Sequence, residues 1–245
     1  MWIKQYGLER SGTNFAKALI EMTSPDTRVL ATVLGSKHAP PDLEGQIALL
    51  EEGEVGIAVT DLTPPDFASI VAAYKSQEIG VLLCVRDVVT WIDAFERHSA
   101  RREKRDAEVL HRERLVQLAD RWIDWIYSVT DWARDCGLRS TWAVHHEVVR
   151  DPQDLIRRIV EWGASPGEVA NVNYLRKAGD FHGRENVTGR PYRTRQYREV
   201  YAGQGQIRIE DVDWIRARVV SRDPRGLAAP FLWDGRPLRR RSASK

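Results

Sequence analysis

The stretch WIKQYGLERSGTNFAKALI, residues 2–20, decides the expected fold because it joins a short strand, a tight polar loop and the start of a helix. Residues 2–8 are typical of a short strand. After the loop, Phe15, Ala18 and Leu19 recur at helical spacing. A strand, a loop of small residues and a helix start are together the parts of an anion-binding loop.

The residues of this loop suit an anionic ligand. The first amides of a helix have no partner within it, and the helix dipole places partial positive charge there. Gly12 lets backbone approach a ligand closely. Ser11 and Thr13 add hydroxyl donors, and Arg10 offers a planar guanidinium to a phosphate. The alternative is an ordinary strand-to-helix turn capped by serine or threonine.

The loop differs from the P-loop of nucleotide hydrolases. Gly7 and Gly12 have the P-loop spacing, but Thr13 and Asn14 stand where that motif has lysine followed by serine or threonine. The run Arg10-Ser11-Gly12-Thr13-Asn14 instead resembles the phosphosulfate loop of sulfotransferases, with Glu9 in place of the usual proline. The resemblance implies that this run binds the phosphosulfate group of the donor PAPS (3′-phosphoadenosine 5′-phosphosulfate) or its product PAP.

Further apolar runs predict the rest of a parallel sheet. The other strand candidates are residues 28–35, 55–60, 80–85 and 140–149. We expect one α/β domain over residues 1–245, with a mainly parallel sheet of about five strands flanked by helices. The order of motifs over roughly residues 2–160 resembles the P-loop-containing sulfotransferase superfamily. This implies a fold of the P-loop nucleotide-binding type.

A long helical region, roughly residues 93–136, separates the fourth expected strand from the fifth. Its first part, residues 98–114, is dense in charges of both signs, which is typical of a solvated helix face or a mobile excursion. Its second part carries an apolar stripe made of Leu115, Leu118, Trp122, Trp125, Val129, Trp132 and Cys136. The stripe could cover the sheet or form a homodimer, and core packing is the favoured interpretation.

Lys37 and His38 follow the second expected strand. In a parallel sheet, chemistry collects beyond the carboxyl ends of the strands. We therefore expect both side chains beside the anion loop, with His38 as a candidate acid or base and Lys37 as a stabiliser of charge. A solvated pair of loop residues is the alternative.

Asp61 ends the third expected strand, where many cytosolic sulfotransferases carry Lys-Thr-His-Leu-Pro and use the histidine as a base. Thr60 and Leu62 match that pattern, and Asp61 takes the place of the histidine. The resemblance implies that Asp61 is a candidate base, since a carboxylate can accept a hydroxyl proton. The alternative is an N-cap or turn residue before a helix that begins near Pro64.

Arg86 follows the fourth expected strand. Sulfotransferases often bind the 3′-phosphate of the donor with an arginine here and a serine eight residues later. Arg86 fits this pattern, but Ala94 stands at the position of the serine. Phosphate binding by Arg86 is therefore expected, while specificity for a 3′-phosphate is in doubt.

The charge is distributed unevenly along the chain. Residues 1–175 carry 20 lysines and arginines against 27 carboxylates, whereas residues 176–245 carry 17 against 8. This basic C-terminal loop region indicates an anionic partner; a nucleotide with several phosphates would suffice, and nucleic acid is not required. Because a late basic loop covers the nucleotide in sulfotransferases, the resemblance implies that the donor also contacts Arg184, Arg190 and Arg193. A basic surface loop is the alternative.

His145 and His146 fall in the last strand candidate, where neighbouring side chains point to opposite faces and cannot easily share a metal. No metal site is therefore expected. Residues 144–152 resemble the Val-Arg-Tyr-Glu-Asp-Leu strand and following Asp-Pro helix of sulfotransferases. The cysteines Cys84 and Cys136 do not make a disulfide framework. Cys84 lies in an apolar strand-like run and is expected to be a buried thiol. With no membrane-spanning apolar run and no signal peptide, we expect a cytoplasmic protein with no membrane partner.

The expected function is transfer of a sulfuryl group from PAPS to a hydroxyl or amine of an unidentified small-molecule or carbohydrate acceptor. Two alternatives stay open. One is a small-molecule kinase, or another phosphoryl transferase, that uses the same loop. The other is a non-catalytic nucleotide-binding protein, which Ala94 and the missing Lys-Thr-His favour.

Overall fold

The computed structural model describes residues 1–53, 62–106, 108–167 and 199–233, and a parallel sheet forms its centre. The strands in this part of the chain are β1 (Trp2–Gly7), β2 (Arg28–Leu30), β3 (Gly80–Val85) and β4 (Ser140–Val144), in the order β2-β1-β3-β4. In the register, Ile3 pairs with Val29 and Gly80, and Cys84 pairs with Gly7 and Ala143. The predicted α/β class and the parallel sheet are confirmed.

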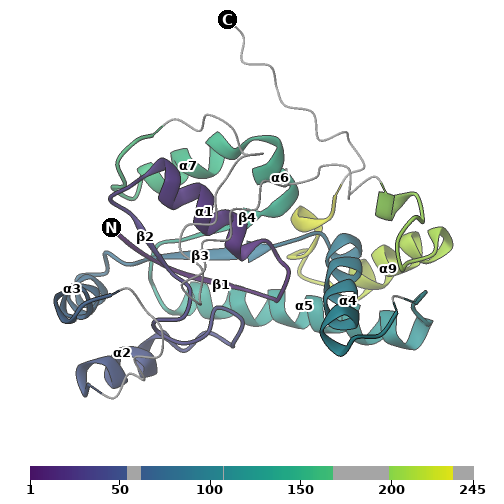
Figure 1. Cartoon of the computed structure of the whole chain (residues 1–245), viewed down its shortest axis with the longest axis horizontal. Coiled ribbons are helices and arrows are strands. Elements are labelled where there is room, and N and C mark those ends of the chain that lie inside the picture. Colours follow the sequence, from purple (N-terminus) through teal and green to yellow (C-terminus); the bar gives the residue numbers. More distant parts are fainter. Residues whose placement is uncertain (54–61, 107, 168–198, 234–245) are drawn as a thin grey trace, which may run out of the picture.

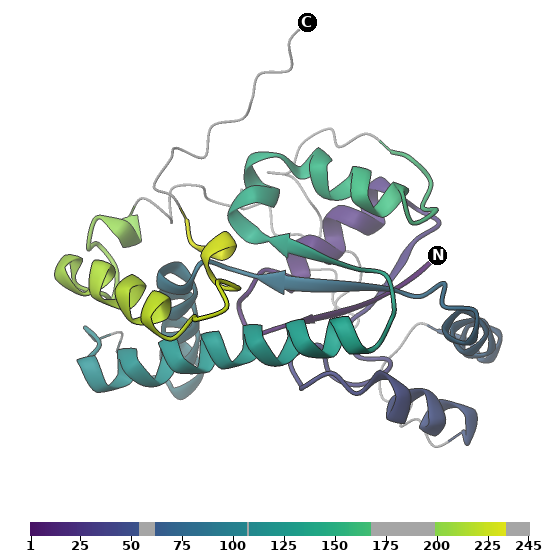
Figure 2. The same cartoon turned by 180° about the vertical axis from the view of Figure 1, so that it is seen from behind.

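Helices cover both faces of the sheet (Figure 1). One face carries α1 (Thr13–Thr23), α6 (His145–Arg150) and α7 (Pro152–Val160). The opposite side carries α5 (Arg112–Asp135), α2 (Leu43–Glu51) and α3 (Pro64–Lys75). Beyond the carboxyl ends of the strands lie α4 (Val88–Glu103), α9 (Ile209–Ser221) and the short 3-10 helix Ala229–Phe231, as the reversed view also shows (Figure 2).

The two faces of β1 follow from the alternation of a strand. Ile3 belongs to the apolar cluster that contains Phe15 and Leu19 of α1. Tyr6, which has the opposite parity, meets Trp132 of α5 with ring centroids 5.2 Å apart. Neighbouring β3 is buried along its whole length, as expected for a strand covered on both sides.

The apolar stripe of α5 packs into the core, which confirms the favoured interpretation. Leu115, Leu118, Trp122 and Val129 are each at most 2% exposed. The helix ends at the position that its sequence predicts, because Gly137 adopts the left-handed backbone conformation, with φ of 70°. Cys84 is also buried, as predicted, and burial raises the pKa of its thiol to about 12.

The strand predicted over residues 28–35 is wrong beyond Leu30, where β2 ends. Leu34 and Gly35 adopt positive φ angles of 64° and 84°, which turn the backbone away from β1. The carbonyls of Val33 and Gly35 accept hydrogen bonds from the side chain of Lys4 rather than from a strand ladder.

The strand predicted over residues 140–149 is wrong beyond Val144, because His145 begins helix α6. Adjacent apolar residues are compatible with a strand or a helix. In the helix, Val148 and Val149 join the cluster formed by α1 and α7, so tertiary packing decides the outcome. The inference that His145 and His146 point to opposite faces of a strand is therefore wrong.

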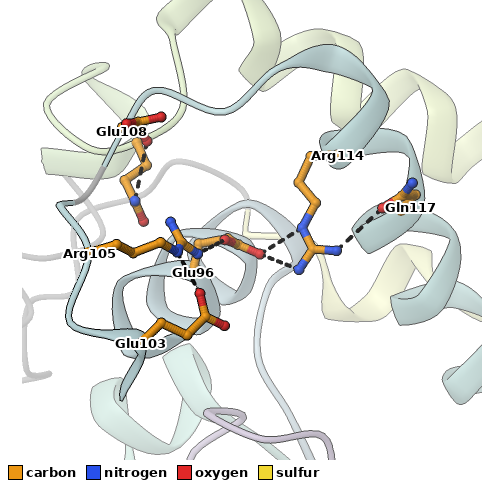
Figure 3. A network of polar contacts seen from close by, with 7 residues as sticks. Glu96, Glu103, Arg105, Glu108, Arg114 and Gln117 are labelled. Atoms are coloured by element: carbon orange, nitrogen blue, oxygen red, sulfur yellow. Dashed lines mark hydrogen bonds and ion pairs between the residues drawn. The ribbon is translucent and has the colours of Figure 1, made fainter. Parts of the chain in front are cut away.

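The charge-dense stretch at the end of α4 and the start of α5 is mostly exposed, as expected of a solvated face, but two of its arginines pair with a buried carboxylate (Figure 3). Glu96 is 2% exposed, and its Oε1 accepts from Nε and Nη2 of Arg114 at 2.8 and 2.6 Å. Its Oε2 accepts from Nη2 of Arg105 at 3.1 Å. Arg105, in the connection after α4, and Arg114, in the first turn of α5, are thus fixed to the same side chain of α4.

The third strand candidate, residues 55–60, lies outside the described residues, and so does Asp61. The N-cap of α3 is Thr63, which forms a capping box with Asp66, so the suggested N-cap role for Asp61 is wrong.

Among the helices that the structure describes, none has both the length and the apolar character needed to cross a bilayer.

Candidate functional site

Polar side chains follow all four strands at the same edge of the sheet. The loop 8–12 leaves β1, Lys37 and His38 come after β2, Arg86 begins the turn after β3, and His145 follows β4 directly. Because the strands are parallel, their carboxyl ends meet at this edge. This edge is the candidate site.

The loop after β1 has a folded-back conformation. Arg10 and Gly12 adopt positive φ angles of 69° and 96°. The amide of Ser11 donates to the carbonyl of Leu8 at 3.1 Å, and Nε1 of the buried Trp91 donates to the carbonyl of Glu9 at 2.8 Å. Trp91 of α4 therefore fixes this loop.

The loop leads into α1 through Gly12, which is its N-cap and forms no side-chain cap. Within the described residues, the amides of Thr13 and Asn14 donate to no protein acceptor. Such amides at the positive end of a helix dipole can receive an anion. The first turn of α1 thus keeps the donors that the sequence analysis expected.

The side chains of the loop point in different directions. Arg10 and Asn14 are exposed, whereas Ser11 and Thr13 are 2% and 4% exposed. Ser11 folds over the strand end, so that a Cβ built on Gly7 would lie 2.5 Å from its Oγ. This Oγ is buried and has no hydrogen-bond partner among the described residues. A buried hydroxyl without a partner is costly, and a ligand oxygen would satisfy it.

His145 is a site residue that sequence reasoning missed. Its ring packs on Gly12, where an added Cβ would lie 2.5 Å from Cδ2, and its centroid is 5.5 Å from that of Phe15. The protein's own imidazole thus occupies space that was expected to admit a ligand. Burial and the nearby Arg86 guanidinium place the pKa of His145 well below 6.5. The sequence feature that could have identified His145 as a site residue is its position directly after a strand that ends at this edge.

Lys37 and His38 lie against the loop, as predicted. Nζ of Lys37 donates to Oδ1 of Asn14, and the amide of Gly7 donates to the carbonyl of Lys37 at 2.8 Å. Nδ1 of His38 lies 2.6 Å from the carbonyl oxygen of Gly7. A carbonyl only accepts, so Nδ1 carries the proton and Nε2 keeps a lone pair. Burial is the main cause that lowers the pKa of His38, and the charge of Lys37 adds to it.

Arg86 lies in the turn between β3 and α4, and it is 7% exposed. Its Nε donates to Oγ1 of Thr90 at 3.2 Å, and its carbonyl accepts from Nε1 of Trp122 at 2.9 Å. Ala94, at the position of the expected serine, is 7% exposed and offers no hydroxyl. The guanidinium therefore has a hydroxyl neighbour four residues on, not eight.

Asp87, next to Arg86, joins the site to the C-terminal part of the chain. Its Oδ2 accepts from the amide of Thr90 at 3.1 Å and so caps α4. Its Oδ1 accepts from the hydroxyl of Tyr201 at 2.8 Å and from the amide of Trp233 at 3.0 Å. The two ends of the described segment 199–233 are thereby anchored at the candidate site.

Several predicted site residues lie outside the described part of the chain: Asp61, Arg184, Arg190 and Arg193. Within the described part, no group of three or more histidine, cysteine or acidic side chains is arranged to hold a metal ion.

A groove of about 670 Å³ opens at the amino ends of the strands, between Trp2, Ser69, Arg139 and Trp162. This groove is at the opposite edge of the sheet from the candidate site.

Comparison of the chain with protein-family models, with curated proteins and with solved structures gives no match.

Proposed function

We propose that this protein binds PAPS at the carboxyl edge of its sheet and transfers the sulfuryl group to a hydroxyl or amine acceptor. The observation that carries the proposal is the contact of Lys37 with Asn14 and of His38 with Gly7, two residues that lie on either side of the loop after β1. An anion on this loop would lie beside a cation and beside a histidine that has an available lone pair. The fold would then be of the P-loop nucleotide-binding type, with α4 and α5 as the excursion between β3 and β4.

The loop suits the donor in two further respects. The amides of Thr13 and Asn14 and the hydroxyl of Ser11 offer donors to the oxygens of the phosphosulfate. Arg10, at the exposed rim of the loop, would add a guanidinium. Arg86 would contact the second phosphate of the nucleotide, with Arg184, Arg190 and Arg193 as further candidates.

The chemistry would rest on position and charge. The bond between sulfur and the bridging oxygen of the donor breaks, and a bond from sulfur to the acceptor oxygen or nitrogen forms. Nε2 of His38 accepts the proton that the acceptor loses, while Lys37 and Arg10 stabilise the charge that develops on the departing phosphate. The contact of Nδ1 of His38 with the carbonyl of Gly7, 2.6 Å away, supports His38 as the base, and Asp61 remains the other candidate.

A non-catalytic nucleotide-binding protein is the second candidate, favoured by the buried Ala94 and by the ring of His145 against Gly12. A phosphoryl transferase would use the same loop and would need magnesium. Retained binding of PAP without transfer to any acceptor would favour the non-catalytic candidate.

Calorimetry with PAP, PAPS, ATP and GTP, with and without magnesium, tests the proposal. We expect PAP and PAPS to bind without magnesium, and Arg10→Ala to weaken binding by about tenfold or more. Arg134→Ala, on the exposed surface of α5, is the matched control and should bind as the wild type does. Binding of ATP or GTP that needs magnesium, or no binding of any nucleotide, would overturn the proposal.

A further inference from the structure

Lys4 is a lysine inside the core. It lies in the middle of β1, its side chain is fully buried, and its Nζ is 5.1 Å from the centroid of the Tyr6 ring. Lysine is almost never fully buried unless its ammonium has partners. The proposed function gives this residue no role.

The partners of Lys4 are two backbone carbonyls of one turn. Its Nζ donates to the oxygen of Val33 at 3.0 Å and to that of Gly35 at 2.6 Å. The turn has two consecutive residues in the left-handed region, Leu34 and Gly35. A leucine rarely adopts this conformation, and it persists only where the surroundings fix it.

The same turn carries the site residues Lys37 and His38. The amide of Lys37 donates to the carbonyl of Ala31 at 2.9 Å and closes the turn. The carbonyl of Lys37 and the ring of His38 then contact Gly7 at the end of β1. Lys4 and Gly7 thus hold residues 31–38 at two points of one strand.

We propose that Lys4 is a positioning residue, whose contacts with Val33 and Gly35 fix the turn and thereby place Lys37 and His38 at the loop. The inference rests on the proposed function only in assigning chemistry to Lys37 and His38. An apolar side chain in this place would leave both carbonyls without this donor. A shorter polar side chain would not reach both.

The contacts do not depend on the charge of Lys4. Burial, and to a smaller extent the charge of Lys37, lower the pKa of Lys4 to about 7. A neutral amine still has two N–H groups, which match the two carbonyl acceptors. The turn therefore keeps its support on either side of neutral pH.

The test is Lys4→Met, compared with Lys75→Met on the exposed surface of α3 as the matched control. Amide exchange of residues 31–38 and the ring ¹⁵N shifts of His38 are measured without ligand. We expect exchange in Lys4→Met to be about tenfold faster or more, and the His38 ring to lose its preference for a proton on Nδ1. Lys75→Met should change neither quantity.

Unchanged exchange and unchanged His38 shifts in folded Lys4→Met would overturn the inference. If this variant lacks a native circular-dichroism spectrum, Lys4→Gln, which keeps one amide donor group, is scored by the same two measurements. Affinity for PAP is measured separately on the wild type. Failure of PAP to bind would reject the proposed function, whereas the exchange and the ring shifts would still decide the role of Lys4.

Discussion

At the scale of single residues, the candidate site depends on close contacts that few other side chains would permit. Gly12 combines a left-handed backbone with the ring of His145 against its Cα. His38 faces a carbonyl that sets its tautomer. Ser11 places a hydroxyl without a partner among the described residues inside the loop. These residues give the loop its shape before any ligand binds.

Gly12→Ala should lower the free energy of unfolding more than Gly137→Ala does. Both glycines have positive φ, but an added Cβ at Gly137 meets nothing within 4 Å, whereas one at Gly12 meets His145. We expect a loss of about 1 kcal/mol at Gly137 from backbone strain and about 1–3 kcal/mol more at Gly12. Urea unfolding measures both, and His145→Ala should restore part of the loss in Gly12→Ala. Equal losses in the two single variants would contradict the contact.

The stability of the protein should fall as the pH drops below 6.5. The folded-state pKa of His145 lies well below this value, and that of His38 is also lowered. Below pH 6.5 the unfolded chain therefore binds protons that the folded protein does not, which favours unfolding until the folded-state pKa is passed. Urea unfolding at about pH 7.5 and about pH 5.5 measures the decrease. His145→Asn should lose less stability over this interval; an equal decrease would refute the assignment to His145.

At the scale of elements, buried acidic side chains connect helices whose pairing the hydrophobic pattern alone does not determine. Glu96 of α4 pairs with Arg114 of α5 and with Arg105 just before it. Asp211 of α9 pairs with Arg112 of α5 at 3.3 Å. The apolar stripe of α5 predicts that this helix has a buried face. The ion pairs with Glu96 and Asp211 determine that α4 and α9 are among its neighbours.

Glu96→Gln should destabilise the packing of α4 on α5. The carboxylate is 2% exposed and bonded to two arginines, so its loss removes charge-assisted hydrogen bonds in a partly buried place. We expect a decrease of about 1–3 kcal/mol in the free energy of unfolding, because the freed arginines can still reach water. Glu103→Gln, on the exposed carboxylate that also pairs with Arg105, is the control and should have little effect. A similar effect of both changes would argue against the role of burial.

At the scale of the whole molecule, the carboxyl edge of the sheet gathers segments that lie far apart in the sequence. The loop after β1, the turn after β2 and the first residue of α6 all meet there. Through Asp87, the same edge also holds Tyr201 and Trp233. The carboxylate of Asp87 is therefore one of the links between residues 199–233 and the candidate site.

Asp87→Ala should loosen the C-terminal segments from the rest of the molecule. The change removes an N-cap and two long-range hydrogen bonds at a fully buried side chain. We expect a loss of about 2–4 kcal/mol and faster amide exchange in residues 199–203 and 229–233. Tyr201→Phe, which removes one of these bonds, should lose about 1 kcal/mol. Unchanged exchange in both segments of Asp87→Ala would show that the anchor lies elsewhere.

The sequence alone determined the class of fold and the place of the loop. Continuous apolar runs at residues 80–85, helical spacing after the loop and the stripe of α5 depend on local periodicity, which a chain carries without its neighbours. The same signals placed Lys37 and His38 at the carboxyl edge, because that edge follows from the direction of parallel strands. Periodicity does not distinguish an apolar strand from a short helix, so it extended the strand past Val144.

Only the tertiary structure decided which groups meet. Val148 and Val149 find their apolar partners in α1 and α7, so helix α6 begins at His145. As a result the ring of His145 packs on Gly12. Tertiary packing also directed Lys4 into the core, where two carbonyls of a distant turn satisfy its ammonium. Contacts of this kind depend on the path of segments about 30 or more than 100 residues away, and no local pattern contains that path.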